Sequence, residues 1–125
     1  ATYGVPELVI RAILKQEGGM VGTMSRNSNG SYDLGPMQIN TINLELISKK
    51  YPFLDWRHIT YNPCINIMVG AWILSTNLYR HGNNTFALGA YNAGTRRTPK
   101  QEQRRQAYAA DVLRIYHQEM AQFRP

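Results

Sequence analysis

The carboxylate at position 17 is the side chain of this sequence best suited to chemistry. It continues a stripe in which Val5, Val9 and Ile13 recur every four residues, the pattern of a buried helix face. Desolvation and the negative end of the helix dipole would both raise the pKa of Glu17. A carboxyl group that keeps its proton near neutrality is what a general acid needs to break a glycosidic bond. The alternative is that Glu17 points to solvent at a frayed last turn.

A second carboxylate, Asp33, lies near Glu17 in the sequence. In a hydrolase of the two-carboxylate type it would activate the attacking water. We favour a structural role instead, in which Asp33 is a turn residue that accepts backbone hydrogen bonds within the loop 29–35.

Metal and cofactor chemistry finds no support in the sequence. His58, His81 and His117 are isolated and lack ligand spacing, so we expect surface or capping histidines, no metal and no cofactor. The single cysteine, Cys64, excludes an internal disulfide and a four-cysteine zinc site. It lies in an apolar run and is therefore predicted to be a small buried hydrophobe.

The elements that must position these groups are predicted to be helices. Gly18-Gly19 ends the first helix, and residues 20–36 form a polar loop whose Asn29-Gly30 turn can hold a short β-hairpin. No strand pattern alternates convincingly, so the fold is mainly α. The apolar spacing predicts helices over 5–17, about 40–50, 63–80, 84–91 and 100–121.

The inward faces of two helices follow from the same spacing. In the second helix Ile39, Ile42 and Leu46 are predicted to point inward, and residues 52–63 form a connecting segment. The last helix presents the apolar stripe Tyr108, Val112, Ile115 and Tyr116.

Length and charge limit the possible partners. A chain of 125 residues is one compact domain, too short for a dinucleotide-binding domain with a second lobe or for a large barrel. Fourteen Lys and Arg against eight Asp and Glu give a net charge of +6, which favours an anionic partner such as nucleic acid, an acidic membrane face or an acidic glycan. No stretch approaches the roughly 20 apolar residues of a membrane span.

Three motifs, in order, resemble those of the lytic transglycosylases. Residues 17–19 followed by 33–40 are similar to the family's Glu-Ser at a helix end, its polar loop and its Gly-Leu-Met-Gln-Ile. Residues 90–94 match its Ala-Tyr-Asn-Ala-Gly, and residues 105–112 look like its C-terminal Tyr-Ala-x-x-Val helix. Two positions depart from the pattern, since Gly18 replaces the usual serine and Pro36 the usual leucine. We expect neither to remove activity, although Gly18 could loosen the position of Glu17.

The resemblance extends over residues 4–118, and residues 62–72 are similar to a helix of the subgroup attached to type III and type IV secretion or conjugation machines. It implies a mainly α, single lysozyme-like domain of the goose-type or soluble lytic transglycosylase kind over residues 1–125, with at most a short β-hairpin. It further implies a monomer that meets peptidoglycan glycan strands and secretion or conjugation components. Its place would be the periplasm, with a signal peptide already removed.

The implied reaction cleaves the β-1,4 bond between N-acetylmuramic acid and N-acetylglucosamine. By resemblance Glu17 first protonates the leaving oxygen and then, as a base, helps the 6-hydroxyl of the sugar close a 1,6-anhydro ring. The substrate's own N-acetyl group assists in place of a second carboxylate. The alternatives are a goose-type hydrolase and a weakly active glycan-binding assembly protein.

The other matched positions have binding roles by the same resemblance. Ser25 corresponds to a serine that holds the N-acetyl group, and Met37 and Gln38 line the groove. Tyr91 orients Glu17 through its hydroxyl, with Asn92 beside it. Tyr108 forms part of the groove wall. The alternatives are core positions for Met37 and for Tyr91.

A basic cluster follows the Tyr-Asn-Ala-Gly motif. A nucleic-acid module would interleave such a cluster with aromatic residues, whereas here Glu102 lies inside it and no groove-reading motif is present. We therefore expect no nucleic acid, and a solvated loop and helix start that attracts carboxylates on peptide stems. Its members are Arg96, Arg97, Lys100, Arg104 and Arg105.

Overall fold

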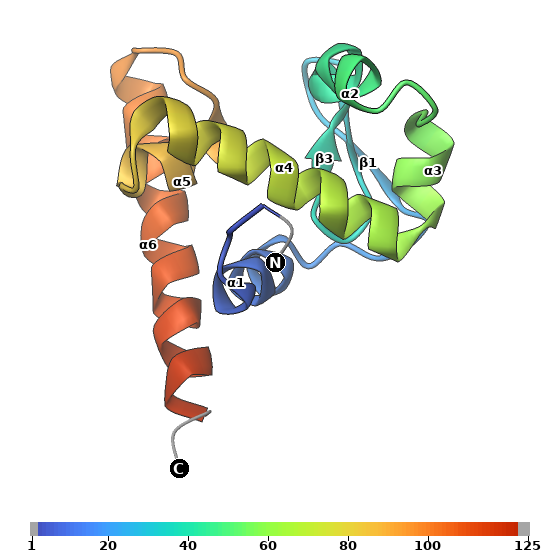
Figure 1. The fold of residues 1–125 in the computed structure, drawn as a ribbon. Helices are drawn as coiled ribbons and strands as arrows, with labels where there is room; N and C mark the ends of the chain where they lie inside the picture. The colour runs from blue at the N-terminus through green and yellow to red at the C-terminus, as the bar shows by residue number, and fades with distance from the viewer. Residues whose placement is uncertain (1–2, 123–125) are drawn as a thin grey trace. The chain divides into compact units, whose positions relative to one another are not determined.

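The computed structural model describes residues 3–122 and is mainly helical, as predicted (Figure 1). Within this range no helix is both long and apolar enough to cross a membrane. The elements in chain order are α1 (Glu7–Glu17), β1 (Met24–Arg26), β2 (Tyr32–Leu34), β3 (Ile39–Asn40), the 3₁₀ turn η1 (Thr41–Asn43), α2 (Leu44–Lys50), α3 (Trp56–Tyr61), α4 (Pro63–His81), α5 (Thr85–Ala93) and α6 (Pro99–Gln122).

The chain divides into two compact units. One unit is Glu17–Gly70, and the other combines the chain up to Gln16 with the chain from Ala71 onward. The boundaries fall at the last residue of α1 and inside α4. We call them the sheet unit and the helical unit, and each is described by itself.

A small antiparallel sheet forms the first part of the sheet unit. Its strand order is β1-β2-β3, with Ser25 opposite Asp33 and Asp33 opposite Asn40. The turn between β1 and β2 closes with the N–H of Asn27 donating to the carbonyl of Ser31 at 2.8 Å. The predicted hairpin is therefore confirmed, and β3 is an additional strand that the sequence did not reveal.

The second predicted helix has a different phase from the one expected. Ile42 is 79% exposed and Leu46 51% exposed, whereas Ile39 and Ile47 are buried. The reason is the turn η1, which Asn40 caps by accepting a hydrogen bond from the N–H of Ile42 at 2.9 Å. A 3₁₀ turn has about 3.0 residues per turn rather than 3.6, so the inward positions shift.

Helix α3 lies in the segment predicted to be a connection. Asp55 caps it, because its carboxylate accepts from the N–H groups of Arg57 and His58, while Nδ1 of His58 accepts from the N–H of Asp55. The side-chain hydrogen bond from Arg57 lowers the pKa of Asp55 to about 2. A histidine in the place of the usual Glu or Gln disguised this capping box in the sequence.

Cys64 is exposed, so its predicted burial is wrong. It lies in the first turn of α4, two residues before Asn66, which is fully buried. Two residues correspond to about 200° around an α-helix, so the helix face that turns Asn66 inward turns Cys64 toward solvent.

The core of the helical unit is formed by buried apolar residues of its helices, among them α1, α5 and α6. The predicted stripe of α6 is confirmed for Tyr108, Val112 and Ile115, which are buried, whereas its fourth member, Tyr116, is half-buried. Asn84 caps α5 by accepting from the N–H of Ala87 at 3.0 Å. Helices α5 and α6 approach closely at Gly89, where a Cβ atom would overlap the carbonyl oxygen of Arg105.

A buried carboxylate ties α6 to α1 within this unit. Glu119 is 2% exposed, and its carboxylate contacts the ammonium group of Lys15 and, at 3.7 Å, Nε of Arg11. The hydrogen bond from Lys15 lowers the pKa of Glu119 although burial acts in the opposite direction. Glu119 is therefore charged in the folded protein at neutral pH.

The ion pair predicts a pH-dependent cost for Glu119→Gln. A carboxyl group whose pKa is lower in the folded state stabilises the fold above its unfolded value of 4.5, and this stabilisation is lost as the pH falls through the folded value. Urea unfolding should therefore find the variant less stable than wild type at neutral pH, with the gap closing below a pH of about 4.5. Glu45→Gln, at an exposed pair with Lys49, is the control and should change little. A gap independent of pH would contradict this account of Glu119.

Candidate functional site

Glu17 is the last residue of α1 and is half-buried. The chain leaves the helix through Gly18, whose φ of +63° lies in the left-handed region. A residue with a Cβ atom there would be strained by roughly 1 kcal/mol or more. The glycine that departs from the family pattern is thus the residue that this helix end requires.

The next residue, Gly19, is packed against the turn that contains the second motif. A Cβ atom at Gly19 would overlap the carbonyl oxygen of Gly35 and lie 2.7 Å from Nε2 of Gln38. No side chain fits in that space. The segment that follows Glu17 and the turn 35–38 are therefore in direct contact within the sheet unit.

Gln38 closes this turn on itself. Its backbone N–H and its Nε2 both donate to the carbonyl of Gly35, at 3.0 and 2.9 Å. Its φ is +51°, an unusual value for a residue other than glycine. Only one N–H of Nε2 is engaged, so its second N–H and Oε1 remain as hydrogen-bonding groups, and Oε1 accepts no hydrogen bond within the described part of the chain.

The buried side chain of Asn66 holds the turn from the α4 side. Its Oδ1 accepts from the N–H of Met37 at 2.9 Å, and its Nδ2 donates to the carbonyls of Leu34 and Ile59, both at 2.9 Å. One amide thus satisfies backbone groups of β2, α3 and the turn. Gly35 has no room for a Cβ atom beside Nδ2 of Asn66.

The other predicted residues of the sheet unit lie at different depths. Ser25 is exposed on β1, whereas Met37 is fully buried and has no surface for a ligand in this conformation. Asp33 lies in β2 rather than in a turn, and its carboxylate accepts from Nδ2 of Asn40 at 2.9 Å instead of from the backbone. The binding roles of Ser25 and Met37 stay predictions.

The helical unit brings together two of its three predicted residues. The rings of Tyr91 and Tyr108 are stacked, with centroids 6.4 Å apart and an interplanar angle of 21°. Tyr91 is half-buried, Tyr108 is buried and Asn92 is exposed. Their roles toward a substrate stay predictions.

The end of the Tyr-Asn-Ala-Gly motif is held by side chains of α6. Nε2 of Gln101 donates to the carbonyl of Ala93 at 2.7 Å, and NH1 of Arg105 donates to the carbonyls of Gly94 and Arg96 at 2.9 and 2.8 Å. Arg105 is 1% exposed, so its predicted place in a solvated cluster is wrong. It is buried because two carbonyl groups and a carboxylate surround its guanidinium.

That carboxylate belongs to Glu102, which accepts from NH2 of Arg105 at 2.8 Å. This hydrogen bond is the main reason that the pKa of Glu102 is lowered. The charge of Arg105 is therefore compensated inside the protein and does not contribute to the basic surface.

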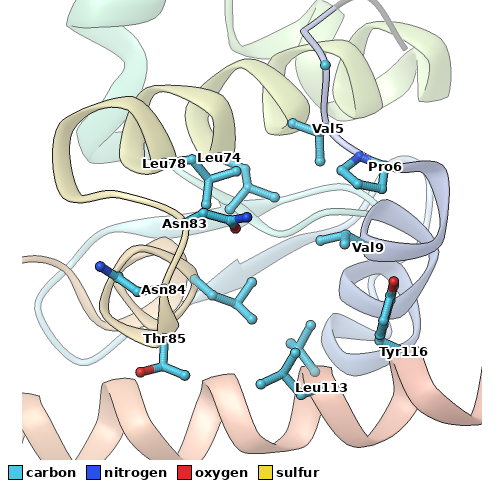
Figure 2. A pocket seen from close by; sticks show the side chains of 13 residues that line it. Val5, Pro6, Val9, Leu74, Leu78, Asn83, Asn84, Thr85, Leu113 and Tyr116 are labelled. Atoms are coloured by element: carbon cyan, nitrogen blue, oxygen red, sulfur yellow. The ribbon is translucent and has the colours of Figure 1, made fainter.

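The helical unit also contains an apolar pocket of about 490 Å³ between α1, α4, α5 and α6 (Figure 2). Val9, Leu78 and Leu113 belong to its walls, with polar groups such as Asn83 and Tyr116. None of the predicted site residues lines it. The hydroxyl and amide groups of a glycan need hydrogen-bonding partners, and a pocket with mainly apolar walls offers few of them.

Metal ligation finds no support within residues 3–122, where no group of three or more His, Cys, Asp or Glu side chains could hold an ion. His58 has a capping role instead.

The sequence reasoning missed the side chains that position the motifs, Asn66, Gln101 and Arg105. Asn66 had a detectable signal, because it lies three residues before Val69 on the buried face of α4. For Gln101 and Arg105 the charged surroundings favoured a solvated face, and nothing local revealed their backbone partners.

Comparisons with known proteins agree with the motifs. The family model "Transglycosylase SLT domain" matches residues 1–113. The chain is 36% identical over 115 residues to "Invasion protein IagB" of Salmonella typhimurium. The aligned region covers 91% of this chain and 69% of that protein. "X polypeptide" of Escherichia coli K12 is also 36% identical, with 91% and 67% covered, and "Protein IpgF" of Shigella flexneri is 33% identical, with 91% and 73% covered.

The hydrogen bonds of Asn66 predict a large cost for Asn66→Ala. The change leaves one N–H and two carbonyl groups buried without their partner, which should lower the free energy of unfolding by about 3 kcal/mol or more. Asn77→Ala in the same helix is the matched control, because Asn77 makes no side-chain hydrogen bond within the described residues. Urea unfolding of both variants measures the difference. Equal stabilities would show that Asn66 does not hold the turn.

Proposed function

Because the chain belongs to the SLT transglycosylase family, we propose that it is a lytic transglycosylase of peptidoglycan. The bond cleaved is the β-1,4 linkage between N-acetylmuramic acid and N-acetylglucosamine, and the product carries 1,6-anhydro-N-acetylmuramic acid. The single acid and base of this reaction is Glu17.

One observation carries the proposal. The helix that presents Glu17 ends there, Gly18 and Gly19 follow, and Gly19 lies against the Gly35–Gln38 turn, so the backbone that carries Glu17 is in contact with the turn of the family motif two residues later. Asp33, the other carboxylate of the region, is occupied by a hydrogen bond from Asn40. A mechanism with one carboxylate fits this arrangement better than one with two.

In the proposed steps Glu17 first donates a proton and later recovers one from the substrate. Protonated Glu17 gives its proton to the glycosidic oxygen as the bond to the anomeric carbon breaks. The carbonyl oxygen of the substrate's N-acetyl group bonds to that carbon from the other side. The Glu17 carboxylate then takes the proton of the 6-hydroxyl, whose oxygen displaces the N-acetyl oxygen and closes the anhydro ring. Glu17 is protonated again, and no water is consumed.

The same resemblance and one relative's name support a cellular role. A protein about one third identical to this chain is named an invasion protein, and residues 62–72 are similar to the secretion and conjugation subgroup. We therefore propose that the enzyme acts in the periplasm and opens the cell wall for a secretion or conjugation apparatus.

Replacing Glu17 by Gln tests the assignment of the acid. The amide has the same shape but cannot donate and recover a proton, so release of soluble muropeptides from purified sacculi should fall by at least about 10³-fold. Mass spectrometry of the wild-type products should find anhydro ends. Circular dichroism and sedimentation with sacculi should be unchanged in the variant. A variant that keeps more than a tenth of wild-type release would sink the proposal.

Asp33→Asn separates a lyase from a two-carboxylate hydrolase. Because Asp33 serves only to accept from Asn40 in our account, the isosteric amide should keep most of the activity, within about twofold of wild type. The same release assay applies. A loss as deep as that of Glu17→Gln, together with products one water heavier, would instead support a goose-type hydrolase.

A further inference from the structure

All of the net charge of the chain resides in the helical unit. The sheet unit, Glu17–Gly70, contains four Lys and Arg and four Asp and Glu. The rest of the chain contains ten Lys and Arg against four Asp and Glu. The basic character is therefore not a diffuse property of the surface, and a feature of the helical unit must account for it.

Four exposed cations are concentrated in one segment of that unit, between the end of α5 and the second turn of α6. We call them the 96–104 cluster. None of the four forms an ion pair within the described residues, and the nearby Glu102 is already engaged by Arg105 and Gln106. Its members are Arg96, Arg97, Lys100 and Arg104.

The backbone beneath the cluster is fixed. Arg105 donates to the carbonyls of Gly94 and Arg96, and Thr98 caps α6 by accepting from the N–H of Gln101 at 3.2 Å. The guanidinium group of Arg97 lies 4.5 Å from the ring centroid of Phe86. A loop held in this way loses less conformational entropy when it binds a ligand than a free loop does.

The cluster also follows directly on the Tyr-Asn-Ala-Gly motif, whose last residue is Gly94. Arginine and lysine recognise carboxylates through charge-assisted hydrogen bonds. In the substrate proposed above the linked sugars are uncharged, and the negative charge is on the carboxylates of the peptide stems. Those carboxylates are the anions that a cluster beside a glycan-binding motif meets.

We propose that the 96–104 cluster binds the carboxylates of peptidoglycan peptide stems, so that the enzyme reads the peptides as well as the glycan strand. This inference rests on the proposed function. It assigns to Arg96, Arg97, Lys100 and Arg104 a role in substrate binding that is separate from the chemistry at Glu17.

The test uses two kinds of sacculi. One is native, and in the other every carboxylate is converted to a neutral amide by carbodiimide coupling with methylamine. The variant Arg96→Gln/Lys100→Gln removes two exposed cations whose side chains make no hydrogen bond, ion pair or ring contact within residues 3–122. The charge-matched control is Lys49→Gln/Lys50→Gln in the sheet unit. Sedimentation measures binding, and muropeptide release measures turnover.

The double variant should bind native sacculi about fivefold more weakly than wild type, since two exposed charge pairs are lost and each contributes only modestly in water. On neutralised sacculi the two proteins should bind equally, and the control should match wild type on both. The advantage of wild type should also shrink as salt is added.

Four results would overturn the inference, three of them obtained with the double variant. The double variant could bind native sacculi as tightly as wild type does. Its loss of binding could be as large on neutralised sacculi as on native sacculi. Its loss of binding could also be no larger than that of the control variant. Tighter binding of wild type to a labelled oligonucleotide than to native sacculi would also overturn it, in favour of nucleic acid. The proposed function fails separately, since the results that contradict it do not depend on the cluster: absence of wild-type turnover, turnover that survives Glu17→Gln, or products that have gained a water.

Discussion

The amide of Asn66 joins three backbone segments that have no other common partner among the described side chains. Its three hydrogen bonds reach β2, α3 and the turn 35–38, and all of them are buried. Buried backbone groups without partners are costly, so this one residue fixes where the turn can lie. The turn 35–38 leaves no room for a side chain at Gly19, which follows Glu17 by two residues. The position of the candidate acid therefore depends on an asparagine of α4 through a chain of backbone contacts.

In the helical unit, too, side chains of one helix hold the backbone of a motif segment by hydrogen bonds to its carbonyl groups. Arg105 and Gln101 reach from α6 to the carbonyls at the end of α5, and Gly89 allows the two helices to approach. In both units a buried polar side chain of a long helix holds a short irregular segment that carries a family motif. Side chains from elsewhere thus satisfy the backbone groups of the motif segments, which fixes where those segments lie within each unit.

The sequence predicted the long helices well because their apolar periodicity extends over three or more turns, as in α1 and α6. It failed where a local interaction changed the phase or made a short helix, as with Asn40 before η1 and Asp55 before α3. Glu17 could be singled out because its stripe is local. The spacing of Asn66 to Val69 could have indicated its burial, but the hydrogen-bond partners of Asn66 and of Arg105 could not be predicted, since they are backbone groups of segments that only the fold brings near. Cys64 shows the same limit, because an apolar run does not say which side of a helix end faces solvent.

The central claim is that one carboxylate, presented at the end of α1, breaks the glycan without water. Digestion of purified sacculi in water enriched in heavy oxygen tests this most directly, with mass spectrometry of the new sugar ends. Our account predicts anhydro products that contain no heavy oxygen. One heavy oxygen atom at each new reducing end would mean that water is the acceptor, and it would contradict the single-carboxylate mechanism.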